Sequence, residues 1–393
     1  MAITGRNEER SGRIRLGMVG GGKDAFIGGV HRIAARIDDQ FELIAGALSS
    51  TPGKAIESGK ALGLAENRTY SSFKEMASRE ARRKDGIEAV SIVTPNHVHF
   101  EAAREFLKRG IHVICDKPLT STLADAKKLA KLAHESDALF ILTHNYTGYP
   151  MIRQAREMVE NGDLGAIRVV QAEYAQDWLT EEAEASGSKQ AEWRVDPARS
   201  GAGGSIGDIG THAFNLLSFV TGLECEGLAA DLHSFGKGRR LDDNAHIMLR
   251  FKGGAKGMLW SSQVAPGNEN GLRLRVYGDK GGLEWAQEDP NYLWFTPFGE
   301  PKRLITRGGA GSGAAAGRVS RIPPGHPEGY LEGFATIYAE AARAILARRS
   351  GSKVPAEVVY PTVDDGLVGV AFIDACVRSA KRNSAWVELA GVR

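Results

Sequence analysis

The first 145 residues alternate short apolar runs with stretches of helical periodicity, and this alternation restricts the chain to few folds. Strands that alternate with helices form parallel βαβ units in a sheet that is covered on both faces. The apolar runs predict strands at 14–19, 41–48, near Thr69, and at 89–93, 112–115 and 139–143. The stretches between them predict helices at 30–37, 54–62, 73–82, 99–109 and 123–136. We therefore expect a doubly wound parallel sheet (Rossmann) that binds ligands at the carboxyl ends of its strands.

After Tyr146 the pattern becomes an alternation of apolar and polar residues. Such alternation is typical of an antiparallel sheet with one face packed and the other free. Because 393 residues exceed one ordinary core, we expect two domains, 1–145 for dinucleotide binding and 146–393 for substrate and subunit contacts. The second half predicts strands at 167–174, 245–251, 256–264, 272–277 and 282–285, helices at 152–161, 213–220 and 364–380, and a mobile loop at 307–318.

Charge and cysteine content exclude several classes of protein. Fifty basic and 48 acidic residues leave a net charge of +2. We see no basic stripe interleaved with aromatics, so neither nucleic acid nor a membrane surface is an expected partner. The scattered cysteines Cys115, Cys225 and Cys376 argue against a disulfide framework or a zinc site. With a polar N-terminus, expected to be a loose tail, and no apolar run of about 18 residues, we expect a cytoplasmic protein.

Three glycines directly after the first strand predict the pyrophosphate loop of a dinucleotide fold. Glycine lets the backbone approach the phosphates, and the next helix supplies N–H donors at its N-terminus. Gly20, Gly22 and Ala25 match the Gly-x-Gly-x-x-Gly/Ala pattern, and Gly28 becomes the third glycine if three residues are inserted. A plain tight turn is the alternative. The expected cofactor contacts here are Gly20, Gly22, Ala25, Phe26, Ile27 and Gly28.

The end of the second strand bears on the choice between NAD and NADP. An acid commonly binds the adenine ribose there in NAD enzymes, whereas this chain has Ser49, Ser50 and Thr51, with Lys54 nearby. Hydroxyls and a lysine could also accept a 2′-phosphate. These residues therefore leave NAD versus NADP open; we expect NAD, with NADP possible, and expect Ser49 and Ser50 to contact it.

The next strand end carries a polar run that is expected to line the nicotinamide. The residues concerned are Thr94, Pro95, Asn96 and His99. His97 and His99 are two residues apart, but no third ligand lies near them in the sequence. We therefore expect no metal site.

Asp116 and Lys117 follow the strand after that, where a doubly wound sheet presents catalytic groups, and both are also expected to contact the cofactor. A lysine there can neutralise charge that develops on a substrate oxygen and lower the pKa of the alcohol being oxidised. The alternative is a surface lysine in a turn.

The stretch 203–212 gathers four glycines around one carboxylate and one imidazole. Its composition predicts a loop that leads into the first turns of a helix. Asp208 and His212 lie four residues apart and would share one face of that helix. Such a pair can move a proton near neutral pH, because the unperturbed pKa of histidine is about 6.5. The alternative is that Asp208 caps the helix and His212 is a core residue.

Candidate substrate contacts lie outside these motifs. Trp193 and Arg194 precede the glycine-rich stretch and offer an aromatic wall and hydrogen-bond donors, although a rim salt bridge would also explain Arg194. His326 lies in a run of prolines and glycines and could cap a helix or reach an active site. The expected substrate contacts are Tyr146, Trp193, Arg194 and His326.

Taken together, these motifs resemble the glucose-fructose oxidoreductase and inositol dehydrogenase family, Gfo/Idh/MocA, over nearly the whole chain. The likeness rests on the glycine loop with His31 after it, Thr94-Pro95-Asn96 with His99, Asp116-Lys117-Pro118 in place of the family's Glu-Lys-Pro, residues 203–212, and Val276-Tyr277-Gly278-Asp279-Lys280-Gly281-Gly282.

The resemblance implies a Rossmann domain followed by an α/β domain with a large open sheet that serves dimer or tetramer contacts. It implies that Lys117 is the active-site lysine, that Asp208 orients the substrate, and that His212 takes the hydroxyl proton as hydride passes to nicotinamide. It also suggests that the His326 segment closes a pocket, in its own or a neighbouring subunit.

We therefore expect an NAD(P)-dependent dehydrogenase that oxidises a secondary hydroxyl of a cyclic polyol or sugar, such as an inositol or an aldose. The alternatives are a glycosidase that uses bound NAD to oxidise its sugar transiently, and a non-catalytic sensor that binds dinucleotide.

Overall fold

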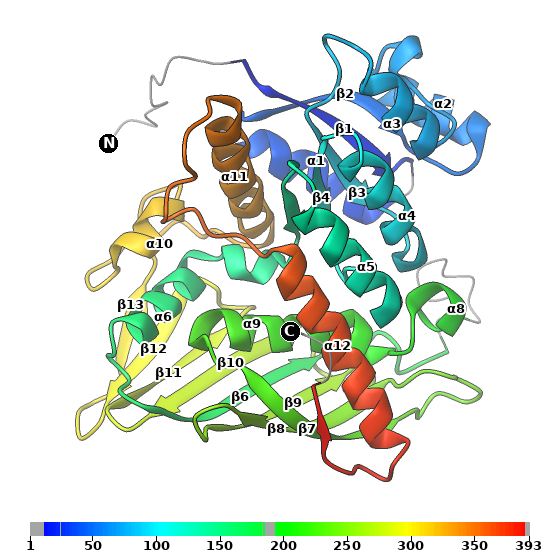
Figure 1. Ribbon diagram of the computed structural model, residues 1–393. Coiled ribbons are helices and arrows are strands. Elements are labelled where there is room, and N and C mark those ends of the chain that lie inside the picture. Colours follow the sequence, from blue (N-terminus) through cyan, green and yellow to red (C-terminus); the bar gives the residue numbers. More distant parts are fainter. Residues whose placement is uncertain (1–11, 24, 183, 185–192, 390–393) are drawn as a thin grey trace.

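The computed structural model describes residues 12–23, 25–182, 184 and 193–389, so most of the expected N-terminal tail lies outside the described residues. The chain forms two sheets with helices between and around them (Figure 1). This arrangement confirms the predicted class, a Rossmann sheet followed by a mostly antiparallel open sheet.

The first sheet has five parallel strands in the order β2-β1-β3-β4-β5. Because β1 lies between β2 and β3, the connections leave it in opposite directions, and a crevice opens at the carboxyl ends of β1 and β3. The strands are β1 (Ile14–Gly20), β2 (Phe41–Ala47), β3 (Ala89–Val93), β4 (His112–Cys115) and β5 (Phe140–Leu142).

Helices cover both faces of this sheet. On one face α1 (Phe26–Ile37) packs with α11 (Tyr330–Arg349), and their side chains share one core with β1, β3, β4 and β5. The other face packs against α3 (Phe73–Glu80), α4 (Asn96–Leu107) and α5 (Leu123–His134), with part of α12 (Val363–Ala380). A short helix, α2 (Pro52–Ala61), follows β2. The C-terminal helices α11 and α12 thus return to the first sheet.

Among the described residues, the second sheet has nine strands in the order β13-β12-β11-β10-β6-β9-β8-β7-β14, in which only β6 and β9 pair in parallel. One face packs under α6 (Pro150–Glu160), α9 (Thr211–Thr221) and α12, as the lower half of Figure 1 shows. The strands are β6 (Ile167–Ala175), β7 (Cys225–His233), β8 (Asn244–Phe251), β9 (Lys256–Ser262), β10 (Gly271–Gly278), β11 (Gly281–Ala286), β12 (Tyr292–Pro297), β13 (Arg303–Thr306) and β14 (Val387–Glu388). Short helical turns occur at Glu66–Arg68, Asn145–Gly148, α8 (Pro197–Ser200), Ile206–Gly210 and α10 (Ala314–Val319).

The predicted strand near Thr69 is wrong. Residues Glu66–Arg68 form a 3-10 turn, and Thr69 makes only an isolated bridge to Gly46. The turn directs the buried Arg68 side chain to the carboxylates of Glu80 and Asp85. These ion pairs hold the segment in a turn at the place where the sequence predicted a strand.

The predicted mobile loop at 307–318 is also wrong. Its second half forms α10, and the Arg318 guanidinium donates to both carboxylate oxygens of Glu340 at 2.6 and 3.1 Å. Arg307 is buried and donates to the main-chain oxygens of Ile322, Pro323 and His326. Glycine and alanine content suggested mobility, but these arginines fix the segment.

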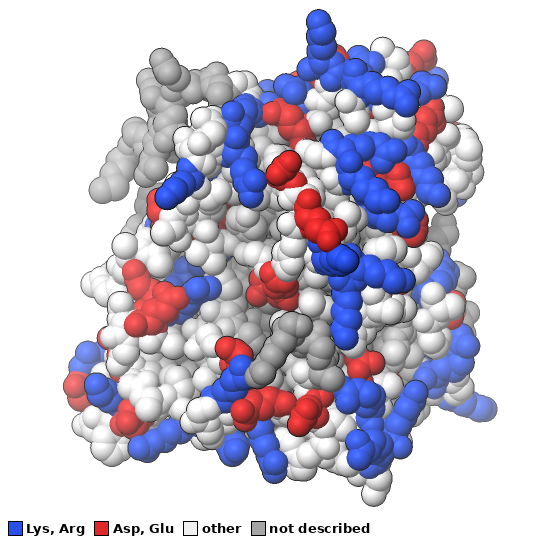
Figure 2. All heavy atoms as spheres, viewed as in Figure 1, with Lys and Arg blue, Asp and Glu red and all other residues white. Residues whose placement is uncertain are grey.

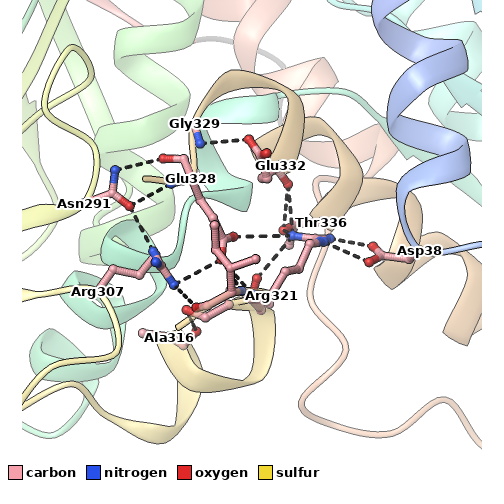
Figure 3. Close-up of polar contacts among 12 residues, drawn as sticks. Asp38, Asn291, Arg307, Ala316, Arg321, Glu328, Gly329, Glu332 and Thr336 are labelled. Atoms are coloured by element: carbon pink, nitrogen blue, oxygen red, sulfur yellow. Dashed lines mark hydrogen bonds and ion pairs between the residues drawn. The ribbon is translucent and has the colours of Figure 1, made fainter. Parts of the chain in front are cut away.

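One polar network ties this segment to both halves of the chain (Figure 3). Glu328 pairs with Arg307 at 3.1 Å and accepts hydrogen bonds from the amides of Arg321 and Ile322. Arg321 in turn binds both carboxylate oxygens of Asp38, directly after α1, at 2.8 and 2.6 Å. The segment between β13 and α11 is thereby anchored to the first helix.

Candidate active site

The glycine loop after β1 is built for close backbone approach. Gly20 and Gly21 have φ values of +80° and +69°, which side chains other than glycine rarely adopt. A Cβ on Gly20 would lie 2.8 Å from the main-chain oxygen of Val93. A Cβ on Gly28 would lie 2.3 Å from the Cα of Gly21, so Gly28 is where α1 packs directly on the loop. Of the two alignments left open by the sequence, the geometry favours Gly28 over Ala25 as the third glycine.

Other residues expected at the cofactor lie at the ends of β2 and β3 and at the start of α1. Ser49 accepts a hydrogen bond from the amide of Thr51 at 3.1 Å, and Ser50 is exposed. The Thr94 hydroxyl is buried and has no hydrogen-bond partner among the described residues, as a group kept for a ligand would. Phe26 is exposed at the start of α1, and Ala25 immediately precedes that helix. The glycine cradle and this hydroxyl fit a dinucleotide.

His99 and Asn96 hold neighbouring segments together. The buried His99 ring has Nδ1 at 2.8 Å from the Pro118 oxygen and Nε2 at 2.9 Å from the Thr94 oxygen. Asn96 donates through its side-chain amide to the main-chain oxygen of Ser200 at 2.9 Å. His99 therefore joins the ends of β3 and β4, and Asn96 joins α4 to α8.

Lys117 and Asp208 form the centre of the candidate site. The Lys117 ammonium donates to the main-chain oxygen of Asp208 and to its Oδ1, the latter at 3.1 Å. Asp208 Oδ2 accepts a hydrogen bond from the Gln263 amide at 2.9 Å and lies 3.2 Å from Nε of Arg194. Its carboxylate therefore binds side chains from three other segments, and the alternative that Asp208 caps its own helix does not hold.

The charges around Asp208 keep it ionised. Burial alone would raise the pKa of Asp208, but Lys117 and Arg194 outweigh burial and hold the pKa well below its usual range. An ionised carboxylate is a strong hydrogen-bond acceptor. Asp208 can therefore orient both Lys117 and a hydroxyl group placed beside them.

His212 lies at the start of α9, one turn beyond Asp208. Burial lowers the pKa of His212 well below its usual range, and the charge of Lys117 lowers it further. Its Nδ1 has no hydrogen-bond partner among the described residues. The rings of Tyr146 and His144 pack edge-on against it, with centroids 4.9 and 5.4 Å away. His212 is thus a neutral imidazole that is able to accept a proton.

The Asp116 carboxylate contacts a cluster of buried polar side chains. Its Oδ1 accepts a hydrogen bond from Thr143 at 2.9 Å and lies 3.8 Å from Nε2 of His31. The other ring nitrogen of His31 meets the hydroxyls of Tyr338 at 2.8 Å and Ser91 at 3.2 Å. Because Tyr338 belongs to α11, the C-terminal region contributes directly to the strand end that carries Lys117.

The predicted substrate residues are only partly brought together. The Arg194 guanidinium stacks on the Trp193 ring at 4.6 Å, and both residues line a hollow with Asn96, Asp208 and Gln263. Tyr146 is buried beside His212, but its hydroxyl bonds to that of Tyr174 at 2.5 Å. The side chain of His326 is exposed on the segment after α10, and in the described structure it makes no contact with these residues.

Three residues near the site were not found from the sequence: Gln263, His144 and Asp242. Gln263 follows β9 and His144 follows β5, so each is a polar residue just past the end of a strand. A polar residue just past a strand end could have been predicted from the sequence as a site candidate. Asp242, in the connection between β7 and β8, carries none, because its contacts with residues 204–206 depend on the folded chain.

Comparisons with known proteins match residues 14–144 to the oxidoreductase family's NAD-binding Rossmann fold and residues 152–284 to the GFO/IDH/MocA C-terminal domain. An oxidoreductase from Sinorhizobium meliloti is 68% identical, with a TM-score of 0.87 over 96% of this chain and 99% of its own. An inositol dehydrogenase homolog from Azotobacter vinelandii, solved with NADH and myo-inositol, is 38% identical, with a TM-score of 0.90 over 96% and 98%. Levoglucosan dehydrogenase from Pseudarthrobacter phenanthrenivorans is 26% identical over 96% of this chain and 98% of its own.

Proposed function

Because the chain belongs to the Gfo/Idh/MocA family of NAD-binding oxidoreductases, we propose that it oxidises a secondary hydroxyl of a neutral cyclic polyol or sugar, such as an inositol or an aldose. Residues 1–145 would bind the cofactor, and residues 146–393 would bind the substrate. The observation that carries the proposal is the Lys117 ammonium bound to Asp208, with neutral His212 one turn away.

Each of the three residues has a distinct task. His212 accepts the proton of the hydroxyl group, because burial keeps its imidazole neutral and its Nδ1 has no hydrogen-bond partner among the described residues. Lys117 stabilises the negative charge that develops on the same oxygen. Asp208 fixes the ammonium and accepts a hydrogen bond from the substrate, while Gln263 and Arg194 hold its second oxygen.

NAD would be held by the glycine cradle, Thr94 and the segment around Asn96, and when bound it supplies the hydride acceptor. The structures of the Azotobacter vinelandii inositol dehydrogenase homolog, solved with NAD+ and with NADH, support NAD. The exposed hydroxyls after β2 remain compatible with NADP.

A neutral substrate fits the charges at the site. Lys117 and Arg194 contribute two positive charges, and Asp116 and Asp208 contribute two negative charges. A neutral ring leaves this balance intact, whereas a sugar acid would add an uncompensated charge in a partly buried site. The two relatives named for myo-inositol and levoglucosan act on or bind neutral cyclic compounds, which supports the same class.

We also propose that the enzyme is a cytoplasmic homo-oligomer. Its three cysteines are free thiols, as a reducing compartment would leave them. No helix in the described part of the chain is long and apolar enough to cross a bilayer. On the face shown in Figure 2, basic and acidic side chains are interspersed, which offers little to nucleic acid. Subunits would meet through the outer face of the second sheet, where Val169, Met248, Met258 and Trp294 are exposed.

The decisive experiment measures NADH and NADPH formation with a panel of inositols, aldoses, anhydrosugars and their glycosides. Turnover of one free polyol is expected. Release of an aglycone without net NADH would instead indicate the redox-assisted glycosidase.

On the substrate so found, we predict that His212→Ala lowers kcat by about 10²- to 10⁴-fold, the usual worth of a general base. NADH binding, followed by fluorescence, should be unchanged. The matched control is His134→Ala, which removes an exposed histidine paired with Asp364 and should leave kcat unaltered. Full turnover by His212→Ala would refute the assigned base.

A further inference from the structure

Asp242 lies in the connection between β7 and β8 and clasps the start of the turn that carries Asp208. Its Oδ1 accepts the amide of Gly204 at 2.7 Å, and its Oδ2 accepts the amide of Ile206 at 2.9 Å. Its main-chain oxygen accepts the intervening amide, that of Ser205, at 2.7 Å. Three consecutive amides of one segment therefore bind a single, almost fully buried aspartate.

This clasp replaces a local helix cap. The first amides of a helical turn lack partners within the turn, and the π-helical turn Ile206–Gly210 has no side-chain cap of its own. The carboxylate of Asp242 supplies the missing acceptors from 36 residues away. A Cβ on Gly204 would lie 2.0 Å from the main-chain oxygen of Asp242, so the glycine is what permits the contact.

Hydrogen bonds connect the residues held by Asp242 to Asp208. The main-chain oxygen of Gly204 accepts the amides of Gly207 at 3.1 Å and Asp208 at 2.9 Å. From the other side, the main-chain oxygen of Asp243 accepts the amide of Gln263 at 2.8 Å, and the Gln263 side chain binds Asp208. Residues 242 and 243 thus hold Asp208 by two independent routes.

We propose that Asp242 is a positioning residue whose ionised carboxylate sets the turn that presents Asp208 and His212 to the substrate. The inference rests on the proposed dehydrogenase function. Asp242 borders the same hollow as Arg194 and Asp208, but both of its carboxylate oxygens accept main-chain amides, so in this scheme it acts through the amides that it binds.

The surroundings of Asp242 make its ionisation sensitive to pH. Burial and the neighbouring Asp243 raise the pKa of Asp242 to about 6, against the two amides that favour the charged form. The other groups around it are the Cys376 thiol of α12 and, in the same hollow, Arg239, Arg194 and Asp208. Arg239 is engaged by Asp243 and Glu184, and Arg194 by Asp208. Protonation would remove an acceptor from the clasp, so activity should fall on the acid side of neutrality.

The test compares wild type with Asp242→Asn, which keeps the size of the side chain but places an amide group against one of the two N–H donors. We expect kcat to fall about ten-fold or more, with an unchanged amount of NADH bound per chain and an unchanged Kd for NADH. The wild-type kcat should decline below about pH 6, and this decline should be absent in the variant. The control is Asp365→Asn, which removes a carboxylate acceptor at an exposed position at the start of α12 and should alter neither kcat nor its pH profile.

A kcat for Asp242→Asn within about two-fold of wild type would overturn the proposal, as would a loss of kcat matched by an equal loss of NADH binding. If the variant does not fold, a wild-type kcat that stays constant down to pH 5 would also overturn the proposal. If wild type oxidises no polyol, the proposed function fails. The clasp is then judged by hydrogen exchange of residues 203–212, which Asp242→Asn should accelerate by about ten-fold relative to Asp365→Asn, and equal exchange would overturn it.

Discussion

At the scale of single residues, the contact between Gly28 and Gly21 decides how closely α1 approaches the cofactor loop. We predict that Gly28→Ala destabilises the fold by about 1–3 kcal/mol, because the new methyl group would overlap the Gly21 backbone. The same shift of the loop should weaken NAD binding. Thermal unfolding and a fluorescence titration with NADH would measure the two effects.

The adjacent residue offers a matched control. A Cβ on Gly29 would meet only the Arg32 side chain, at 4.0 Å, and alanine is favoured over glycine inside a helix. Gly29→Ala should therefore leave NADH binding unaltered and stability equal or higher. Equal behaviour of the two variants would contradict the role given to Gly28.

Asp116 links the active site to acid stability. Burial would raise the pKa of Asp116, but His31, Lys117 and His99 outweigh burial and lower it to about 2. A carboxyl whose pKa is lower in the folded chain adds stability above its unfolded pKa of about 3.9, and this contribution is lost as the pH falls through the folded value.

We therefore predict that wild type exceeds Asp116→Asn by about 2 kcal/mol in unfolding free energy at pH 6. The difference should shrink between about pH 4 and pH 2. Urea unfolding of both proteins across this range would show it, and a difference that does not vary with pH would contradict the predicted charge.

The sequence carried information on some site residues and not on others. Gly20, Lys117, Asp208 and His212 could be predicted because each belongs to a short pattern whose spacing is tied to a local structure. Gln263 and Asp242 act through contacts with Asp208, Gly204 and Ile206 that span 36 to 55 residues. No local pattern encodes such contacts, so only the folded chain reveals them.

At the scale of elements, the network around Arg307 holds the segment between β13 and α11 in place. Both Arg307 and Glu328 are almost fully buried. We predict that Arg307→Met destabilises the protein by about 3–5 kcal/mol, because it leaves the Glu328 carboxylate buried without its main partner. Thermal unfolding would measure the loss.

Arg303→Met is the control for this prediction. Arg303 pairs with Glu300 at an exposed position four residues earlier in the chain, where an ion pair is worth about 0–1 kcal/mol. Similar losses from the two substitutions would mean that burial does not set the cost.

Element prediction succeeded where one local signal dominated. The parallel strands and the final helix follow directly from apolar periodicity. Composition misled at 307–318, since Arg307 and Arg318 override the glycine and alanine content through contacts with Glu328 and Glu340. Helix α11 was not predicted, although Glu332 in its first turn accepts the amide of Gly329, directly before the helix.

At the scale of the whole molecule, the outer face of the second sheet is the proposed subunit interface. Met248 and Met258 are directly paired across β8 and β9, and each side chain is more than half exposed. We predict that Met258→Glu reduces the oligomeric state, because it would bury a charge between subunits. Light scattering coupled to size-exclusion chromatography would report the mass.

Ile56→Glu is the matched substitution on another surface. Ile56 is exposed on α2, away from the second sheet, and should leave the mass unchanged. A wild-type mass for Met258→Glu, or a monomeric wild type, would rule out this interface.

The placement of α11 has a consequence for synthesis on the ribosome. The last strand of the parallel sheet is complete at Leu142, yet one face of that sheet waits for Phe334, Ile337 and Tyr338. About 190 residues must therefore be translated while Ile14 and Leu16 lack part of their final cover. Until α11 is made, the first sheet exposes apolar side chains that α11 later covers. Chains that end before α11 should therefore depend on chaperones to stay in solution.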